Sequence, residues 1–306
     1  MGTTARCLER PPAGWRELIA ADPGATAALR PAMWRAMAAI RPGAVVRCLV
    51  VERDGELCGG MPVLVERRAG RHWLHSLPYL LPGAPVATAG AHAEVDAAAA
   101  AALRELQRQL RAAGGEWSLY RPGGPAMAPA VVETPVGETR WVEAATIELA
   151  EGPEAAWARL DREARRDIRQ ARARLVWTED PEALEEAYAL HLAQARAWRA
   201  HRPPPIELSR RLLADGGDGL GPVARLFTVR RGTALVCATL ALDHPRETMP
   251  WWSGAVPDAR RLGAFALLLW GVVEWAARGG RDRVNLGGSA GAGPVATFKD
   301  SMGARA

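Results

Sequence analysis

The chain has 306 residues, of which 49% are hydrophobic and 24% are charged, and its net charge is +5. This composition excludes a disordered chain, and the length predicts two domains of roughly 100–200 residues each. The positive charge favours anionic ligands, and the four cysteines form no Cys-x-x-Cys pair, so we expect neither disulfides nor a bound metal.

The sequence also predicts where the protein resides. No basic region followed by an apolar stretch opens the chain, so no signal peptide is expected. The most apolar run, Leu262–Val273, is shorter than the roughly 20 residues that a membrane span needs, and Glu274 ends it. We interpret this run as a buried helix and expect a cytoplasmic protein with no membrane span.

The first half of the chain predicts a hairpin, a helix and a strand. Two apolar runs in residues 49–65 flank Asp54-Gly55, which is typical of a two-residue hairpin turn. A helical pattern covers Glu94–Ala113 and ends at Gly114-Gly115, glycines that suit a left-handed helix cap. A strand is predicted at Trp117–Tyr120.

A helical region follows. Glu154–Leu175 carries a dense series of arginines, and Glu179–Ala200 predicts a second helix with Pro181 near its first turn. Pro203-Pro204-Pro205 breaks the chain before a short helix at Ile206–Ala214.

The second half repeats the order of the first. Residues 226–242 predict another hairpin, Arg261–Arg278 is helical, and a strand follows at Arg283–Leu286. Recurrence of a whole supersecondary unit predicts two similar α/β domains with mixed sheets. We place them at residues 1–148 and at residues 149–306, the second beginning with the basic helical region.

Two residue types occur once each. Lys299 is the single lysine among 39 lysines and arginines, and Asn285 is the single asparagine. An ammonium differs from a guanidinium in hydration and in how readily its pKa shifts on burial, so a position that stayed lysine favours a chemical role over chance survival. Asn285 precedes Leu286-Gly287-Gly288, where an ordinary turn is the alternative explanation. We predict that Lys299 and Asn285 are catalytic.

Candidate anion-binding residues lie in two places. Residues 260–264 precede the apolar helix, and a helix N-terminus attracts phosphates, although an exposed arginine pair would look the same. In the helical region, arginines are more commonly solvated and paired with neighbouring carboxylates than bound to substrate. The predicted phosphate-binding residues are Arg260, Arg261, Gly263, Ala264, Arg166, Arg169, Arg196 and Arg199.

Other catalytic signals are weak. Asp243-His244 is a candidate general base, against a polar turn before Pro245. No nucleophile elbow, Walker loop or metal signature is present. We expect Phe298, Trp251 and Gly287 to line the pocket.

A hairpin, a strand, a helix and a strand form the central part of the GNAT acyltransferase fold. Two such units in tandem resemble the Fem family of peptidoglycan bridge-forming aminoacyltransferases and its bacterial relatives. The most specific match is Asn285-Leu286-Gly287 followed by Phe298-Lys299-x-x-x-Gly303, which implies that Lys299 lies at the reaction centre. Looser matches are Pro31-x-x-Trp34, Arg165-Arg166-x-x-Arg169-x-Ala171 and Pro257-x-x-Arg260-x-Leu262.

The resemblance implies transfer of an acyl or aminoacyl group to an amine or hydroxyl of an anionic cell-envelope or sugar precursor. Such reactions pass through a tetrahedral oxyanion, which we expect Lys299 to stabilise. GNAT enzymes that use acyl-CoA hold its pyrophosphate through Arg/Gln-x-x-Gly-x-Gly/Ala, and residues 260–263 match the first four positions whereas Phe265 departs from the last. This partial match favours an acyl-CoA donor, whereas the Fem resemblance favours aminoacyl-tRNA.

A different class of function stays open. A catalytically silent module would use the doubled fold to bind an anionic ligand. The single lysine argues against this alternative, because a scaffold has little reason to retain it. No permanently bound cofactor is expected in either case.

Overall fold

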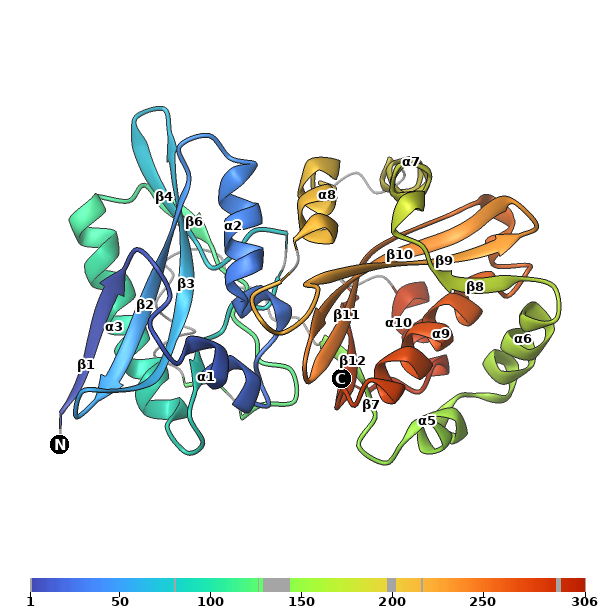
Figure 1. The fold of residues 1–306 in the computed structure, drawn as a ribbon, viewed down its shortest axis with the longest axis horizontal. Coiled ribbons are helices and arrows are strands. Elements are labelled where there is room, and N and C mark those ends of the chain that lie inside the picture. Colours follow the sequence, from blue (N-terminus) through green and yellow to red (C-terminus); the bar gives the residue numbers. More distant parts are fainter. Residues whose placement is uncertain are drawn as a thin grey trace. The chain divides into compact units, whose positions relative to one another are not determined.

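The computed structural model describes residues 2–79, 81–125, 127–128, 144–196, 202–215, 217–289 and 293–305. It divides into two compact units (Figure 1). Unit 1 comprises Met1–Thr139 and Gly217–Gly221, and unit 2 comprises Arg140–Gly216 and Pro222–Ala306. Each unit is built on one six-stranded mixed sheet within the described residues.

The sheet of unit 1 has the order β1-β2-β3-β4-β6, and β5 pairs with β3. All neighbours are antiparallel except β4 and β6, which are parallel. The strands are β1 (Thr3–Leu8), β2 (Val45–Arg53), β3 (Glu56–Arg68), β4 (Arg71–His75), β5 (Val86–Ala87) and β6 (Gly114–Glu116). The helices are α1 (Trp15–Ala21), η1 (Ala27–Leu29), α2 (Pro31–Ala39) and α3 (His92–Leu110).

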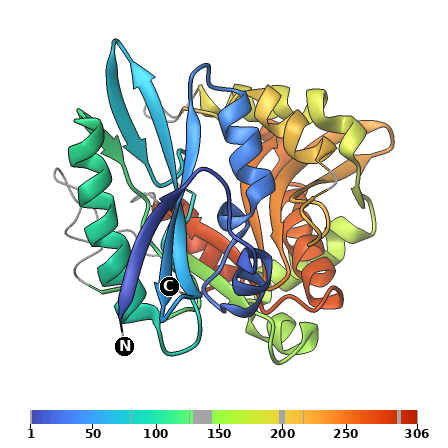
Figure 2. The same cartoon turned by 60° about the vertical axis from the view of Figure 1, so that its left-hand side comes forward.

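Helices cover both faces of this sheet (Figure 2). The buried stripe of α3, which includes Val95 and Leu103, packs on Val63 and Val65 of β3. Helices α1 and α2 contact the sheet from the other side. The predicted hairpin is confirmed: β2 and β3 join at Asp54 and Gly55, both with positive φ (52° and 87°), as a type I′ turn requires.

The sheet of unit 2 has the order β7-β12-β11-β10-β9-β8, and β11 and β12 are its parallel neighbours. Its strands are β7 (Ala144–Glu148), β8 (Val176–Glu179), β9 (Ala224–Arg231), β10 (Ala234–His244), β11 (Glu247–Ala255) and β12 (Arg283–Gly288). Its helices are α5 (Pro153–Arg159), α6 (Arg162–Arg172), η2 (Pro181–Ala183), α7 (Leu184–Ala195), α8 (Ile206–Ala214), η3 (Pro257–Ala259), α9 (Ala264–Arg278) and α10 (Gly293–Ser301).

The apolar run interpreted as a buried helix is α9, and residues 266–273 of it are all buried. Helices α5 and α6 pack with α9 in one core against the sheet. Helices α7 and α8 lie on the opposite face (Figure 1). No helix among the described residues is both long and apolar enough to cross a membrane.

Some predicted elements differ from the structure. The helix expected over Glu154–Leu175 is two helices, because the Asp161 carboxylate accepts a hydrogen bond from Ala164 N (2.6 Å) and caps a new start at α6. The helix expected from Glu179 begins at Leu184, directly after η2. Glu179 instead ends β8, whose Val176, Trp177 and Thr178 suit a strand. The strand expected at Trp117–Tyr120 lies instead at Gly114–Glu116.

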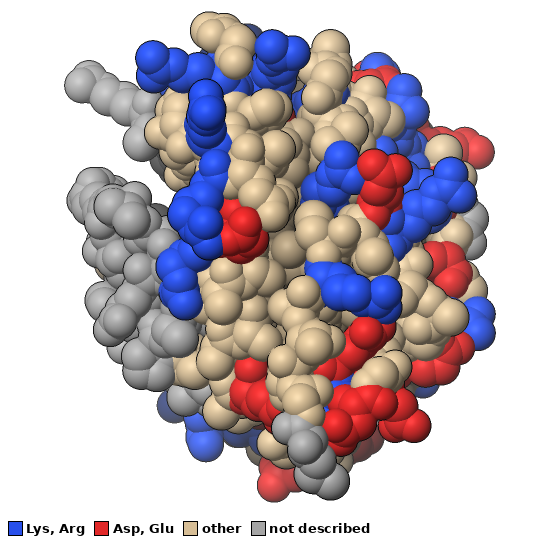
Figure 3. All heavy atoms as spheres, turned by 90° about the vertical axis from the view of Figure 1, so that its left-hand side faces the viewer, with Lys and Arg blue, Asp and Glu red and all other residues tan. Residues whose placement is uncertain are grey.

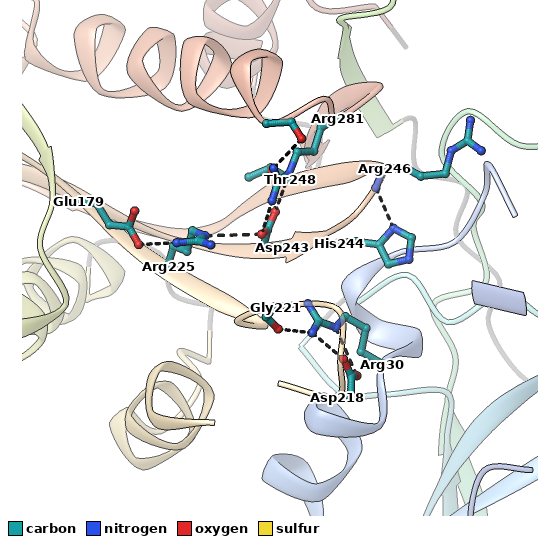
Figure 4. A network of polar contacts seen from close by, with 11 residues as sticks. Arg30, Glu179, Asp218, Gly221, Arg225, Asp243, His244, Arg246, Thr248 and Arg281 are labelled. Carbon is teal, nitrogen blue, oxygen red and sulfur yellow. Dashed lines mark hydrogen bonds and ion pairs between the residues drawn. The ribbon is translucent and has the colours of Figure 1, made fainter. Parts of the chain in front are cut away.

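The predicted repeat is confirmed. The series β2-β3-β4-α3-β6 recurs as β9-β10-β11-α9-β12, with the short β5 as an addition before α3. In each unit the strand after the helix pairs in parallel with the third strand of the series. The predicted domain boundary lies after residue 148, at the end of β7. This strand pairs with β12 in the sheet of unit 2. Unit 1 also includes residues 217–221, where Asp218 forms an ion pair with the buried Arg30 (2.7 Å; Figure 4).

Candidate functional site

The parallel strands β11 and β12 pair over a short distance only. Their register is limited to Glu247 with Arg283 and Thr248 with Val284 within the described residues. Beyond these pairs β12 continues to Gly288 beside β7, and β11 continues to Ala255 beside β10. The end of β12 therefore carries backbone groups that β11 does not bind.

Lys299 binds that end of β12. It lies on α10 and is 7% exposed, and its Nζ donates hydrogen bonds to Gly287 O (2.7 Å) and Gly288 O (2.9 Å). An ammonium has three donors, and the described residues provide no acceptor for the third. Burial lowers the pKa of Lys299 to about 8.

Asn285 binds the backbone N–H of Gly287, the residue whose carbonyl oxygen Lys299 binds. Its Oδ1 accepts a hydrogen bond from Gly287 N (2.8 Å), and its Nδ2 donates to Glu247 Oε1 (3.3 Å). Gly287 has a φ of +64°, so Asn285 does serve the turn that was the alternative explanation for it. Arg283 Nε donates to the other Glu247 oxygen (2.8 Å), which completes a buried polar cluster.

The structure also places the predicted pocket residues Phe298 and Trp251. The rings of Phe298 and Phe265 lie 5.5 Å apart, so α10 contacts the first turn of α9. Trp251 lies at a β-bulge, because Trp252 pairs with Leu240 and Pro250 pairs with Ala241, which leaves Trp251 without an opposite residue on β10. Bulges are frequent next to active sites, where they redirect a side chain.

The predicted phosphate-binding loop leads into α9. Gly263 caps that helix with a φ of +64°, and no side chain of the described residues caps its first N–H groups. A Cβ atom on Gly263 would lie 2.9 Å from Asp167 O, so the close contact of α6 and α9 also requires glycine. Ala264 is the buried first residue of α9, and Arg260 is exposed.

A cavity of about 140 Å³ lies beside this loop, and we call it the α9 cavity. Its cations are Arg174, Arg231 and Arg261, and its one carboxylate, Asp167, already binds Arg166 (3.0 Å). No described carboxylate pairs with Arg174 or Arg231, whereas the exposed Arg261 binds Asp258 (2.9 Å). The lining residues are Asp167, Gln170, Arg174, Leu175, Arg231, Arg261, Leu262 and Gly263.

Sequence reasoning missed Arg174 and Arg231 as site residues. One follows α6 and the other ends β9, and nothing local distinguishes them from the many other arginines of this chain. Only their convergence on the loop before α9 sets them apart.

Two of the other predicted arginines, Arg166 and Arg169, have the partners of a surface helix. Arg166 is exposed and binds Glu163 (3.2 Å) and Asp167, while the Arg169 guanidinium lies 5.4 Å from the ring centre of Trp157. Arg196 is exposed just after α7. Arg199 lies outside the described residues.

The candidate base Asp243-His244 lies inside a polar network (Figure 4). Strand β10 runs through both residues, so the polar turn expected there is absent at these positions. Asp243 is buried and accepts hydrogen bonds from Arg281 Nη2 (2.7 Å) and Thr248 Oγ1 (3.1 Å). His244 Nδ1 accepts from Arg246 N (3.3 Å). These contacts give both residues structural roles.

The described residues contain no cluster of three or more histidine, cysteine, aspartate or glutamate side chains that could hold a metal ion. The arrangement instead offers an immobilised ammonium, a diverging strand pair and a cationic cavity at a helix start.

Residues 156–300 match the family model described as acetyltransferase (GNAT) domain. Unit 2 therefore contains a GNAT domain. This domain includes β12, Lys299 and the loop before α9. No curated protein sequence matches the chain.

Solved structures extend the likeness over both units. FemX has a TM-score of 0.68 at 11% identity, covering 98% of this chain and 94% of that chain. A tandem GNAT protein from the clavulanic acid biosynthesis pathway, solved without AcCoA, has a TM-score of 0.54 at 16% identity, covering 98% and 95%. A conserved protein of unknown function from Bacteroides thetaiotaomicron has a TM-score of 0.53 at 12% identity, covering 97% and 94%. At these identities the likeness concerns the fold, and the predicted tandem GNAT fold is confirmed.

Proposed function

We propose that this protein transfers an acyl group from acyl-CoA to an amine or hydroxyl of an anionic acceptor, and that Lys299 stabilises the tetrahedral oxyanion. The observation that carries this proposal is the buried Lys299 ammonium, bound to two carbonyls at the end of β12 within a GNAT domain.

The geometry around Lys299 suits a preorganised donor. The carbonyls of Gly287 and Gly288 hold Nζ in place, so its remaining N–H needs no reorganisation when negative charge develops on a substrate oxygen. The site is largely shielded from water, which strengthens the interaction. A single donor of this kind is worth about 3–4 kcal/mol of the reaction barrier.

The α9 cavity supports a phosphate-bearing donor. Arg261 is paired with Asp258 (2.9 Å) and Asp167 with Arg166, whereas Arg174 and Arg231 have no carboxylate partner among the described residues. The cavity therefore carries net positive charge beside the start of α9. Guanidinium groups and helix N-termini both bind phosphate oxygens well. Phe265, which departs from the acyl-CoA pattern, packs on Phe298 of α10.

We further propose that the acceptor is a cell-envelope or sugar precursor and that the reaction takes place in the cytoplasm. The net charge of +5 favours an anionic acceptor. The resemblance of residues 285–303 to the closing motif of the Fem family supports this class of acceptor. Asn285 would contribute by holding Gly287 in the conformation that Lys299 binds.

Calorimetry with acetyl-CoA, free CoA and charged tRNA tests the donor. We expect saturable binding of acetyl-CoA and CoA, and no competition from charged tRNA. Binding of charged tRNA alone would overturn the acyl-CoA proposal in favour of aminoacyl transfer. Pantetheine, which lacks phosphates, is the matched control ligand.

Release of CoA thiol in the presence of a panel of amines and amino sugars tests the reaction. The rival proposal, a silent binding module, predicts CoA binding with no thiol release for any acceptor. Turnover that is lost in Lys299→Arg, while CoA still binds with wild-type affinity, would support the catalytic proposal. Full activity of that variant would contradict it.

A further inference from the structure

Unit 1 carries a groove at the end of its sheet where the β3–β4 turn meets the end of α3. The groove has a volume of about 440 Å³ and is lined by Gly70, Arg71, His72, Leu110, Arg111 and Ala113. His72 Nδ1 donates a hydrogen bond to Leu110 O (3.0 Å), which ties β4 to the last turn of α3. We call this feature the edge groove.

The edge groove is cationic. Arg71 and Arg111 line it, and Arg67 lies opposite His72 in the β3–β4 register. All three arginines are exposed, and none has an ion-pair partner among the described residues. No carboxylate lines the groove. Figure 3, which faces unit 1, shows arginine side chains gathered in its upper part.

The internal repeat gives a direct comparison. In unit 1, Ala113 N donates to His72 O (2.8 Å), one residue before the Trp73–Gly114 pair of the parallel strands. In unit 2, Asp282 N donates to Arg246 O (2.9 Å), one residue before the equivalent Glu247–Arg283 pair. Ala113 therefore occupies the position of Asp282, and His72 that of Arg246.

The residues beside these two parallel strand pairs differ in how their charges are paired. In unit 2, Asp282 binds Arg246 (2.6 Å) and Asp243 binds Arg281 (2.7 Å), so each arginine has a carboxylate. Figure 4 shows the contact between Arg281 and Asp243. In unit 1 the positions of Asp282, Arg281 and Arg246 carry Ala113, Ala112 and His72, so the paired charges are absent there. The guanidinium groups of the edge groove instead come from Arg71 and Arg111, at the positions of Pro245 and Gly280, and no described carboxylate pairs with them. Exposed like charges repel, and an anionic ligand would remove that repulsion.

We propose that the edge groove binds a small phosphorylated molecule, with Arg71 and Arg111 as the principal phosphate ligands. Guanidinium forks match phosphate oxygens in geometry and charge. The volume of the groove exceeds that of a single phosphate group, so a sugar or alcohol carrying the phosphate would fit.

Arg111 provides a test that spares the fold. It adopts the left-handed conformation with a φ of +47°, which glycine tolerates better than arginine. Arg111→Gly therefore removes the guanidinium and relieves backbone strain. Arg71→Gln is equally mild, because Arg71 is exposed at a turn.

The binding experiment uses the full chain carrying Arg174→Gln and Arg231→Gln, so that the α9 cavity does not contribute. Inorganic pyrophosphate and glycerol 3-phosphate are titrated by calorimetry at low salt. We expect saturable binding that Arg71→Gln with Arg111→Gly weakens at least about tenfold, the loss of one or two charged hydrogen bonds. Arg246→Gln, at the equivalent edge of unit 2, is the matched control and should leave binding unchanged.

Ala113→Asp is the converse test, because it installs the carboxylate that unit 2 carries at Asp282. We expect it to abolish phosphate binding and to leave the circular dichroism spectrum unchanged. The proposal is overturned if neither probe saturates, if the groove variants bind like their parent, or if the protein binds only RNA or phosphatidylglycerol vesicles. Because the α9 cavity is disabled throughout, failure here says nothing against the proposed acyl transfer.

Discussion

Asn285 and Lys299 hold the same residue from two sides: the Asn285 side chain accepts a hydrogen bond from Gly287 N, and Lys299 donates one to Gly287 O. The single asparagine and the single lysine of the chain therefore bind the same turn. Asn285 fixes the turn at Gly287, and the turn presents two carbonyls that fix the ammonium. Aspartate at 285 or arginine at 299 would disturb this joint geometry.

Substitution of Lys299 tests whether its ammonium stabilises the oxyanion. Lys299→Arg and Lys299→Met should lower kcat for acyl transfer by about 10²–10³-fold, the cost of losing one preorganised donor, with little change in the KM for acyl-CoA. Thiol release measures both constants. Ethylammonium should partly restore the rate of Lys299→Gly, because it fills the vacated site with the same functional group. A rise in KM alone would show that Lys299 binds the donor and does not act on the oxyanion.

The pH dependence of turnover follows from the pKa of Lys299, about 8. Only the protonated amine donates to an oxyanion, so kcat at saturating acceptor should fall as pH rises through about 8. A profile of kcat from pH 6 to 10 measures this limb. A rate that keeps rising to pH 10 would contradict a role for the ammonium.

The free energy of unfolding should rise with pH in the range where kcat falls. The pKa of Lys299 is about 8 in the folded state, against an ordinary value of 10.5, so between these pH values the unfolded chain binds more protons. Stability therefore rises with pH across this window, and Lys299→Met should lack that rise. Urea unfolding at pH 7.5 and pH 10 measures the difference between the two proteins.

Gly263→Ala tests the contact between α6 and α9. The variant places a Cβ 2.9 Å from Asp167 O in a left-handed conformation, so we expect a loss of unfolding free energy of about 1–3 kcal/mol and weaker CoA binding. Gly232→Ala is the matched control, since Gly232 has a φ of +58° but no atom within 4 Å of an added Cβ. Equal losses in urea unfolding would show that conformation alone, and not the contact, requires glycine at 263.

Arg174→Gln and Arg231→Gln test the α9 cavity as a donor site. Each should weaken CoA binding about tenfold, because each removes a charged hydrogen bond to phosphate, and neither should affect pantetheine. Arg278→Gln is the control, since Arg278 is highly exposed and lies near Glu274 on the same helix. Unchanged CoA affinity in both cavity variants would place the phosphates elsewhere.

Substitution of Asn285 tests the turn. Asn285→Asp would place a second carboxylate beside Glu247 Oε1 and remove a donor, so we expect a loss of about 1–3 kcal/mol in unfolding free energy at pH 7. The loss should shrink towards pH 5, where one of the two carboxylates takes up a proton. Urea unfolding at both pH values checks this. An equal loss at both would point to packing and not to charge.

The repeated order of elements, the buried α9 and the hairpin turn at Asp54 and Gly55 could all be predicted from the sequence, because periodicity and turn chemistry are local properties. The sequence also brought Asn285 and Lys299 to attention through their rarity. Three features could be seen only in the folded chain: β11 and β12 diverge, Lys299 binds two carbonyls, and Arg174, Arg231 and Arg261 share one cavity. These contacts join segments far apart in the chain, and in a sequence so rich in arginine only packing distinguishes a paired guanidinium from one left free for a ligand.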